Sequence, residues 1–352
     1  MELVRLPLDR ALGAILAHNV VDPDGRRRLR KGRPLTEEAL ELLREMGRRT
    51  VYVARLDPDD LGEDEAATRI AKAVIGDCGT LRCSRAKTGR VNFYAKTRGL
   101  VRIDVARLGE INGCPGVTLA TLPRHTPVQA GQMVATLKII PYAIPESVVA
   151  DAINRAGGNP TASPSHPPAP LLEVEALRSR SVALVLTGAP GAQERVVSGF
   201  AGALGARLER LGSQLATTDF VATDGDDAEE ALASALRRHL DAGYDLLLVA
   251  GDTAIQDIED ITPRAIALAG GTVECFGAPV DPGNLLLVAY CGETPILGTP
   301  GCSRSPKANI VDLVLPRLLI GDRLTHLDLI ALAHGGLLED VPERPLPRSR
   351  LG

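Results

Sequence analysis

The chain has 352 residues, which is enough for two or three domains, and its 45% hydrophobic and 24% charged residues are typical of soluble globular proteins. The formal net charge of −4 gives no reason to expect a nucleic-acid partner, and no apolar stretch approaches the roughly 20 residues that cross a membrane. Because the N-terminus lacks a basic start with an apolar segment and none of the six cysteines forms a C-x-x-C pair, we expect a cytoplasmic protein with free thiols.

Residues 1–56 are expected to form a small α/β unit. Apolar residues near helical spacing in Leu6 to Leu16 indicate a short helix or an extended segment leading into one. Six of the eight residues at 26–33 are basic, a run that favours a solvated hairpin edge over a phosphate-binding patch. Thr36 predicts the start of a capped helix, and the TVYVARL segment at 50–56 predicts a strand.

Residues 57–156 are predicted to form a mostly β module, because short strand-like runs there are separated by Gly and Pro. These runs are VNFYAK, GLVRID, GVTLATL and MVATLKIIPYAI. One helix is expected at Ala66 to Ile75. Residues 157–172 contain five prolines and almost no apolar side chains in their Pro-rich part, which predicts a semi-extended linker.

Residues 173–322 alternate between strand-like and helix-like segments, which predicts a three-layer α/β domain with a mostly parallel sheet. Helices are expected at Glu194–Leu211, Ala228–Ala242, Thr262–Ala269 and Lys307–Leu319. Residues 323–352 form a C-terminal extension whose Pro- and Arg-rich end is expected to be disordered.

Ligands bind such a sheet beyond the carboxyl ends of its strands, so the loops that follow the strands are the candidate sites. The first two loops are Thr187 to Glu194 and Ala222 to Asp227. A plain strand-to-helix turn explains the first equally well. The second loop contains Asp224, Asp226 and Asp227 ahead of a helix. Helix capping explains one of these aspartates but does not require all three.

The third loop follows a buried strand at Leu246 to Val249 and breaks at Gly251. Its polar residues are Asp252, Thr253, Asp257, Glu259 and Asp260. Clustered carboxylates suit Mg²⁺, which takes one or two of them together with phosphate oxygens and water. A surface loop of no special function is the alternative. A helix is expected to follow, with Thr262 as N-cap and Pro263 as its first residue.

The fourth loop, Gly298 to Asn309, precedes the last large helix. Glycines that permit unusual backbone angles are combined with hydroxyls and positive charge in Gly298, Gly301, Ser303, Arg304, Ser305 and Lys307. With a helix N-terminus behind it, this composition predicts an anion site. The loop lacks the Gly-Lys-Ser/Thr ending of a Walker A motif.

On these motifs the second domain resembles the molybdopterin-binding domain shared by the MogA, MoaB and MoeA proteins. GDTAIQDIED at 251–260 is similar to the pattern G-G-V-S-V-G-[DE]-x-D, and GTPGCSRSPK at 298–307 to G-L-P-G-N-P-x-S. LPLDRALGAILAHNV and KGRPLTEEALELLREMGRRTVYVARL resemble the start of MoeA. The strongest resemblance is to bacterial molybdopterin-binding proteins that occur alone or fused to a MobA-like nucleotidyltransferase.

The resemblance implies molybdopterin or molybdenum cofactor as the ligand, with Mg²⁺ on Asp257 and Asp260, which would also be the catalytic residues. The implied ligand-binding residues are Gly251, Asp252, Thr253, Glu259, Gly298, Pro300, Gly301, Ser303 and Ser305. The implied role is in molybdenum cofactor biosynthesis, by nucleotidyl transfer or molybdenum insertion. A molybdoenzyme or nucleotidyltransferase partner and a homo-oligomer are also implied.

The chain departs from the family pattern at three places. Asp252 stands where a second glycine is expected, and Asp281 and Asn284 replace the two lysines of a K-P-G-K-P segment. Cys302-Ser303 replaces the Asn-Pro of the last loop. These changes favour binding over catalysis, so a non-catalytic carrier that delivers the cofactor is the alternative function.

Overall fold

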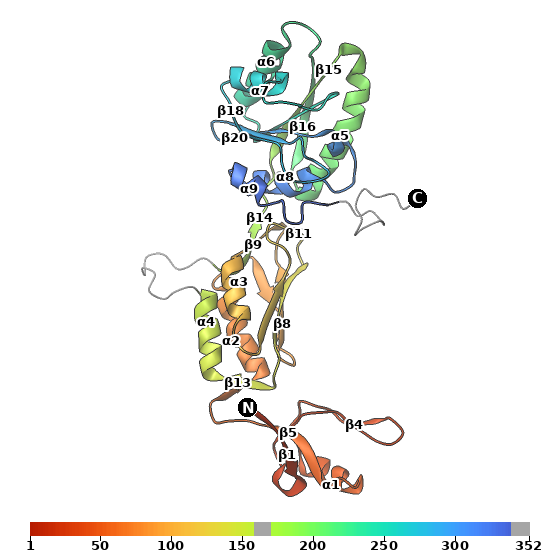
Figure 1. Ribbon diagram of the computed structural model, residues 1–352, viewed down its shortest axis with the longest axis vertical. Coiled ribbons are helices and arrows are strands. Elements are labelled where there is room, and N and C mark those ends of the chain that lie inside the picture. The colour runs from red at the N-terminus through yellow and green to blue at the C-terminus, as the bar shows by residue number, and fades with distance from the viewer. Residues whose placement is uncertain (158–169, 339–352) are drawn as a thin grey trace. The chain divides into compact units, whose positions relative to one another are not determined.

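The computed structural model describes residues 1–157 and 170–338, and its contacts divide the chain into two compact units, residues 1–175 and 176–352 (Figure 1). The predicted Pro-rich linker lies mostly outside the described residues, and so does the Pro- and Arg-rich end of the chain. Within the two described ranges, no helix combines the length and the apolar character needed to span a membrane.

The first 56 residues of unit 1 form a three-stranded antiparallel sheet with one helix and a core of their own. The sheet has the order β1 (Glu2–Pro7), β5 (Thr50–Arg55) and β2 (Ile15–Leu16). The predicted helix is α1 (Glu37–Glu45), and the Thr36 side chain caps it by accepting a hydrogen bond from the Ala39 N–H at 3.3 Å.

Two other segments of this region also follow the sequence pattern. The apolar segment that begins at Leu6 is extended and leads into a short 3₁₀ helix, η1 (Leu8–Arg10). The basic run lies on an exposed hairpin of β3 (Val20–Val21) and β4 (Arg27–Leu29), as expected of a solvated edge.

The rest of unit 1 is an antiparallel sheet of order β10-β12-β8-β7 covered by helices. Its strands are β10 (Val117–Thr121), β12 (Met133–Ile139), β8 (Arg90–Ala95) and β7 (Leu81–Cys83). The expected helix is α2 (Glu63–Ile75), which packs on β8 and β12. Two further helices, α3 (Val105–Asn112) and α4 (Glu146–Gly157), are not predicted by the sequence pattern. The module therefore contains more helix than its Gly- and Pro-separated runs indicate.

Smaller strands complete unit 1. A three-stranded sheet has the order β11 (Pro127–Val128), β9 (Gly99–Ile103) and β14 (Leu172–Ala176), and β13 (Ala143–Pro145) pairs with β6 (Asp60–Gly62).

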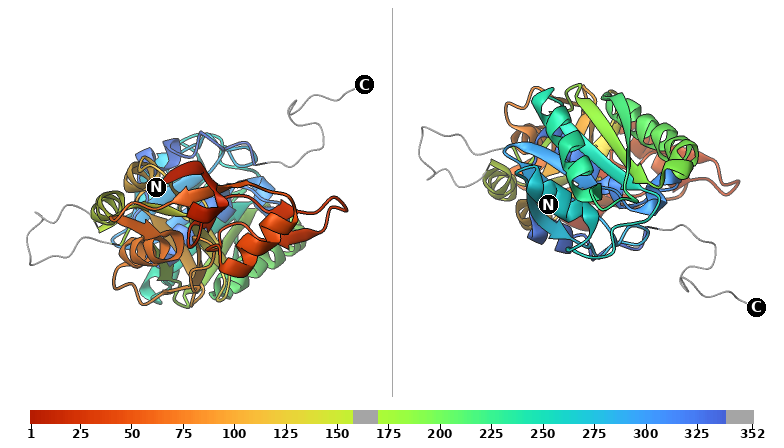
Figure 2. Two further views of the ribbon diagram at one scale, coloured as in Figure 1. Left: turned by 90° about the horizontal axis from the view of Figure 1, so that it is seen from below. Right: turned by 90° about the horizontal axis from the view of Figure 1, so that it is seen from above.

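Unit 2 is a three-layer α/β domain, which confirms the predicted fold class (Figures 1 and 2). Its six-stranded sheet has the order β16-β15-β17-β20-β19-β18. The strands are β15 (Ser181–Gly188), β16 (Gln214–Ala222), β17 (Leu246–Gly251), β18 (Thr272–Phe276), β19 (Leu287–Cys291) and β20 (Thr294–Gly298). The first four strands in this spatial order are parallel, and β19 is antiparallel to both of its neighbours.

Helices cover both faces of this sheet because successive side chains of each strand point to opposite faces. Leu184 of β15 belongs to the core shared with α5 (Gln193–Leu211) and α8 (Ile310–Ile320). Its neighbour Val185 belongs to the core shared with α6 (Ala228–Asp241) and α7 (Ile261–Leu268). A short helix, α9 (His326–Ile330), follows α8.

The start of α7 differs from the expectation. The helix begins at Ile261 with Asp260 as N-cap, so the prediction of Thr262 in that role is wrong. Asp260 precedes Thr262 in the chain, and its carboxylate accepts a hydrogen bond from the Ile261 N–H at 2.7 Å.

The start of α8 also differs, because the helix begins at Ile310 rather than at Lys307. The preceding loop contains instead a short 3₁₀ helix, η3 (Gly301–Arg304), followed by irregular chain. A buried arginine described below binds the carbonyl groups of Ser305 and Lys307, which keeps them from serving as the first acceptors of a helix.

Candidate functional site

The four candidate loops meet at the carboxyl edge of the parallel strands. The Asp252 N–H donates to the Thr187 carbonyl at 2.9 Å, and the Thr223 N–H donates to the Gly188 carbonyl at 3.0 Å. The Thr299 N–H donates to the Val249 carbonyl at 2.8 Å. The loops that follow β15, β16, β17 and β20 therefore lie next to one another.

Gly251 and Gly298 are required by packing at this edge. A Cβ on Gly251 would lie 2.4 Å from the Thr187 Oγ1, and a Cβ on Gly298 would lie 2.8 Å from the Ile255 side chain. At either distance the neighbouring side chain would have to shift to make room. These glycines thus fix the close approach of the loops whether or not a ligand binds beside them.

Asp252 forms a two-pronged ion pair with Arg195 of α5. The two carboxylate oxygens accept hydrogen bonds from the Arg195 guanidinium at 2.7 and 2.8 Å. The hydrogen bonds from Arg195 lower the pKa of the Asp252 carboxyl, against a smaller effect of burial. No local sequence pattern identifies Arg195, because it lies 57 positions from Asp252 in the chain.

The carboxylates that follow Asp252 are held by the loop itself. Asp260 accepts from the Ile261 N–H with one oxygen and from the Gln256 N–H, at 3.0 Å, with the other. Asp257 is exposed and accepts from the Glu259 N–H at 2.9 Å. Among residues 1–157 and 170–338, no group of three or more His, Cys, Asp or Glu side chains is placed to hold a metal ion.

This donor set limits what Mg²⁺ could use. Asp257 and Asp260 offer two carboxylates, and both oxygens of Asp260 already accept hydrogen bonds, one from the first residue of α7 and one from the loop. Mg²⁺ is commonly held by one or two carboxylates when substrate phosphates and water complete the octahedron. Mg²⁺ on these two residues therefore stays a prediction, and it would need a phosphorylated ligand to complete its coordination.

The hydroxyls of the Gly298 loop differ in accessibility. Ser303 is fully buried, and its Oγ lies 2.7 Å from the Pro300 carbonyl and 3.2 Å from the Thr299 Oγ1. Ser305 is partly exposed, and its Oγ accepts from the Lys307 N–H at 3.2 Å. Ser303 thus holds the loop from within, and Ser305 is the hydroxyl that faces outward.

Arg304 connects the two central loops. Its guanidinium donates to the Gly251 carbonyl at 3.1 Å and to the Asp252 carbonyl at 3.2 Å, and it lies 4.6 Å from the centre of the Phe200 ring. Within the described chain, its buried Nε has no hydrogen-bond partner. The charge of Arg304 therefore lies at the junction of the loops, on a side chain fixed by Phe200 and two carbonyl groups.

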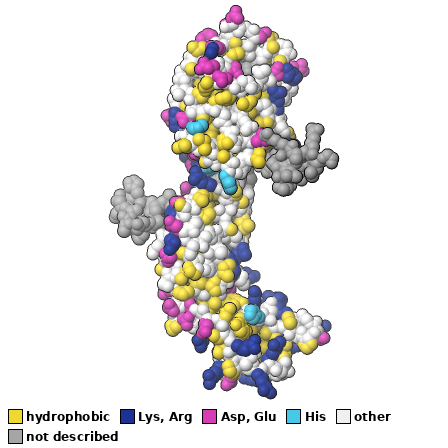
Figure 3. All heavy atoms as spheres, in the orientation of Figure 1, with side chains coloured by type: hydrophobic (Ala, Val, Ile, Leu, Met, Phe, Trp, Pro, Cys, Tyr) yellow, Lys and Arg dark blue, Asp and Glu magenta, His cyan; other side chains and the backbone are white. Residues whose placement is uncertain are grey.

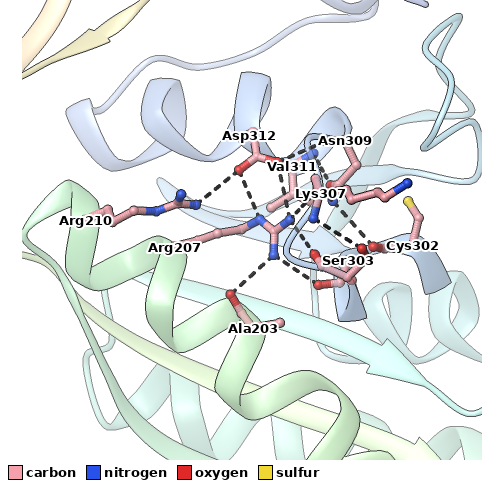
Figure 4. Close-up of polar contacts among 10 residues, drawn as sticks. Ala203, Arg207, Arg210, Cys302, Ser303, Lys307, Asn309, Val311 and Asp312 are labelled. Carbon is pink, nitrogen blue, oxygen red and sulfur yellow. Dashed lines mark hydrogen bonds and ion pairs between the residues drawn. The ribbon is translucent and has the colours of Figure 1, made fainter. Parts of the chain in front are cut away.

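Arg207 of α5 is the buried anchor of the same loop (Figure 4). Its side chain is 2% exposed and donates to the carbonyls of Ser303, Ser305 and Lys307 at 3.2, 2.8 and 3.0 Å. It also donates to Asp312 at 3.0 Å. No loop pattern identifies Arg207, although a lone arginine on the apolar face of a helix is the signal of such a buried anchor.

The N-terminus of α8 is already capped. The Asn309 side chain accepts from the Val311 N–H, and Asp312 accepts from the Asn309 N–H, both at 3.0 Å. The expectation that this helix end binds the anion is therefore wrong. At the start of this loop, the Gly301 N–H has no hydrogen-bond acceptor within the described chain, and the Cys302 N–H lies only against its own sulfur.

Other predicted residues lie at the periphery. Thr253 and Glu259 are exposed, and Glu259 lies 3.3 Å from Arg264. Pro300 is buried beside Ser303. Asp281, which replaces a family lysine, is partly buried, and its backbone pairs with Gly336 and Leu338.

Comparison with known proteins adds one sequence match and several structural ones. Residues 5–55 match a family model described as a domain of unknown function (DUF8806), and no curated protein matches the chain. The structural matches include a molybdenum cofactor biosynthesis protein from Pyrococcus furiosus, at 14% identity, 94% coverage of this chain, 65% coverage of that chain and a TM-score of 0.23.

Two further structural matches are of the same kind. The molybdopterin biosynthesis moea protein from Pyrococcus horikosii has 14% identity, 90% and 75% coverage and a TM-score of 0.29. The molybdopterin biosynthesis Mog protein from Mycobacterium ulcerans has 17% identity, 40% and 92% coverage and a TM-score of 0.25. TM-scores this low carry no argument about function, which must come from the residues of the site.

Proposed function

We propose that unit 2 binds a phosphorylated ligand of the molybdopterin type and that the protein acts in molybdenum cofactor biosynthesis. One observation carries the proposal. The two loops whose sequences resemble the molybdopterin-binding pattern, at 251–260 and 298–307, are joined at the sheet edge by Arg304. A purely structural role would explain why Arg304 joins the two loops. It would not explain why both loop sequences resemble the molybdopterin-binding pattern.

The loop after β20 supplies the groups that receive the phosphate. The N–H groups of Gly301 and Cys302, neither of which has an oxygen acceptor in the described chain, are donors of the kind that bind anions, and the Ser305 hydroxyl is accessible beside them. The Arg304 guanidinium adds positive charge that its contacts with carbonyl groups do not neutralise.

The finer part of the proposal concerns chemistry. Mg²⁺ bound with the ligand would neutralise phosphate charge during nucleotidyl transfer or molybdenum insertion. Asp257 and Asp260 are the residues that would hold it. Asp260 would do so while it caps α7, so its position is set by the helix.

A carrier that binds the cofactor without reacting is the second candidate. Asp281 and Asn284 stand where the family pattern has lysines, so these positions offer no positive charge to bind an anionic second substrate. Asp252 adds a carboxylate beside the phosphate loop and occupies Arg195. Such a carrier would deliver the cofactor to a molybdoenzyme or a nucleotidyltransferase, and we propose self-association of the chain as well.

Titration of the protein with molybdopterin tests the binding. We expect micromolar affinity, and absence of binding at these concentrations would refute the proposal. Asp252→Gly should raise the affinity severalfold because it removes a negative charge and frees Arg195. Asp224→Ala, which removes an exposed carboxylate from a neighbouring loop, is the matched control.

Turnover separates the two candidates. The protein is incubated with molybdopterin, Mg²⁺ and ATP, and in a second reaction with molybdate. Formation of adenylylated product or insertion of molybdenum, lost in Asp257→Ala, identifies an enzyme. Binding without turnover that Asp257→Ala leaves unchanged identifies a carrier.

A further inference from the structure

The N-terminal region, residues 1–56, contains a hollow of about 610 Å³ that the proposed function does not use. Its floor is apolar and consists of the buried side chains Leu16, Leu43 and Val51. Small-molecule sites have volumes of roughly 300–1,000 Å³ and combine an apolar floor with a few polar groups. The hollow therefore has the size and the construction of a ligand site.

The charged residues that line this hollow all have one sign. They are Arg5, Arg48 and Arg49, and no Asp or Glu is among the lining residues. Residues 1–56 carry 12 Lys and Arg against 8 Asp and Glu, whereas the whole chain has a net charge of −4. Figure 3 shows basic side chains gathered over this end of the chain, around one histidine.

These arginines lack the carboxylate partners that several other arginines of the protein have. Arg195 pairs with Asp252, for example, and Arg207 with Asp312. Within residues 1–56, all of which are described, the Arg48 and Arg49 side chains form no ion pair or hydrogen bond. The only side-chain contact of Arg5 there is with the Tyr52 ring, 5.9 Å from its centre.

The backbone holds the base of both arginines in place. The Arg48 N–H donates to the Leu43 carbonyl at 2.9 Å, and the Arg49 carbonyl accepts from the Leu8 N–H at 3.3 Å. The side chains of Arg48 and Arg49 thus extend from a turn after α1 whose backbone is held by hydrogen bonds. Guanidinium groups bind phosphate through paired, charge-assisted hydrogen bonds.

A flat aromatic wall lies in the same hollow. The rings of His18 and Tyr52 stack with their centres 5.5 Å apart and their planes at 25°. Tyr52 is 38% exposed, so part of this wall is open to solvent. A planar ring can rest on such a surface while its charged groups reach the arginines.

We infer that residues 1–56 form a binding site for a small molecule with two or more phosphates, such as a nucleoside di- or triphosphate. Arg5, Arg48 and Arg49 bind the phosphates, and the His18–Tyr52 wall receives the ring. The limited volume of the hollow, about 610 Å³, favours this ligand over a nucleic-acid strand, which binds along an extended groove. The site belongs to the region that matches a domain of unknown function.

Calorimetric titration of the full chain with ATP and with inorganic tripolyphosphate, in Mg²⁺-free buffer, tests the inference. We expect Arg48→Ala/Arg49→Ala to weaken ATP binding at least about tenfold, because two charge-assisted contacts are lost. Arg48→Lys/Arg49→Lys should retain part of the affinity, since the charge remains but the paired geometry does not. Arg44→Ala, an exposed arginine outside the hollow, should bind as the unmodified chain does.

Four further outcomes bear on the inference. Tighter binding of ATP than of tripolyphosphate supports a contact with the aromatic wall, and equal binding supports recognition of phosphates alone. Unchanged ATP binding in Arg48→Ala/Arg49→Ala overturns the inference. It is also overturned if a single-stranded oligonucleotide displaces ATP at a lower concentration than tripolyphosphate does. The phosphate loop of unit 2 is intact in all these variants, so its own binding of molybdopterin is measured separately.

Discussion

At the scale of single residues, Arg207 has the largest structural role near the candidate site. It is buried, and its guanidinium satisfies three carbonyl groups of one loop and the carboxylate of Asp312. A charge in such a place is stable only when every donor has an acceptor.

Arg207→Met should therefore lower the free energy of unfolding of unit 2 by about 3 kcal/mol or more, because it leaves Asp312 and the loop carbonyls without their donor. Arg210→Ala is the control. Arg210 lies 3.6 Å from the same carboxylate but is 67% exposed, so its loss should cost at most about 0.5 kcal/mol. Urea unfolding followed by circular dichroism measures both, and equal losses would contradict the role given to Arg207.

The residues that sequence reasoning could not find are those that act across long separations. Asp252 is visible as a departure from a glycine pair, but its partner Arg195 is not, because only the fold brings α5 beside the loop. The loop pattern identifies Ser303 as a hydroxyl but not that it points inward. Local sequence thus predicts which residue types a loop offers, and packing determines which of them face a ligand.

At the scale of elements, the caps determine where helices begin. The alternation of apolar segments is enough to predict α5, α6, α7 and α8, since each buries a periodic apolar face. It does not predict the first residues of α7 and α8. Several neighbouring Asp, Thr and Asn residues could each be the N-cap of these helices. Which one caps the helix depends on the backbone carbonyl and N–H groups that the preceding loop leaves without partners.

The cap of α7 gives a prediction that separates structure from ligand binding. Asp260→Ala should destabilise unit 2 by about 1 kcal/mol, because two backbone N–H groups lose their acceptor. Asp257→Ala should change stability by less than about 0.5 kcal/mol, since the side chain is exposed. Chemical denaturation compares the two, and a larger loss for Asp257→Ala would contradict the assignment of the cap.

The cap of α9 gives a prediction about pH. Burial tends to raise the pKa of Asp328, but hydrogen bonds from Arg317 and Thr325 outweigh it and lower the pKa to about 2. The ordinary value in an unfolded chain is about 3.9. The ionised carboxylate therefore stabilises the fold above pH about 4, and this contribution is lost as the pH falls towards 2.

Asp328→Asn should accordingly cost about 2 kcal/mol at pH 7, and the difference from the unmodified chain should shrink as the pH falls below about 4. Glu293→Gln is the control, because Glu293 is 97% exposed and should show no such dependence. Urea unfolding at pH 7, 5, 4 and 3 measures the difference. A constant cost at every pH would show that the charge of Asp328 is irrelevant.

At the scale of the whole molecule, each unit has cores of its own. One large core lies within unit 1 and contains Leu137, and another lies within unit 2 and contains Leu204. The alternation of strands and helices predicts the layers of unit 2, because parallel strands need covering helices. The helices α3 and α4 of unit 1 are not predicted because each directly follows a strand-like run, which the sequence pattern extends into them.

Because the two units have separate cores, we expect them to unfold in two separate transitions. Leu204→Ala should remove about 2–5 kcal/mol from unit 2 and leave the transition of unit 1 where it is. Leu137→Ala should do the reverse. Differential scanning calorimetry resolves the two transitions, and a single transition that both substitutions shift equally would show that the units unfold as one.

The anchoring of the 298–309 loop by Arg207 and Arg304 has a consequence for the kinetics and energetics of binding. Both arginines hold carbonyl groups of loops at the sheet edge, so the edge keeps its shape without a ligand. A pre-organised loop loses little conformational entropy when it binds, and the arriving molecule need not wait for a rearrangement. The association rate should then be limited by diffusion and charge. Differences in affinity among ligands should appear as differences in their dissociation rates.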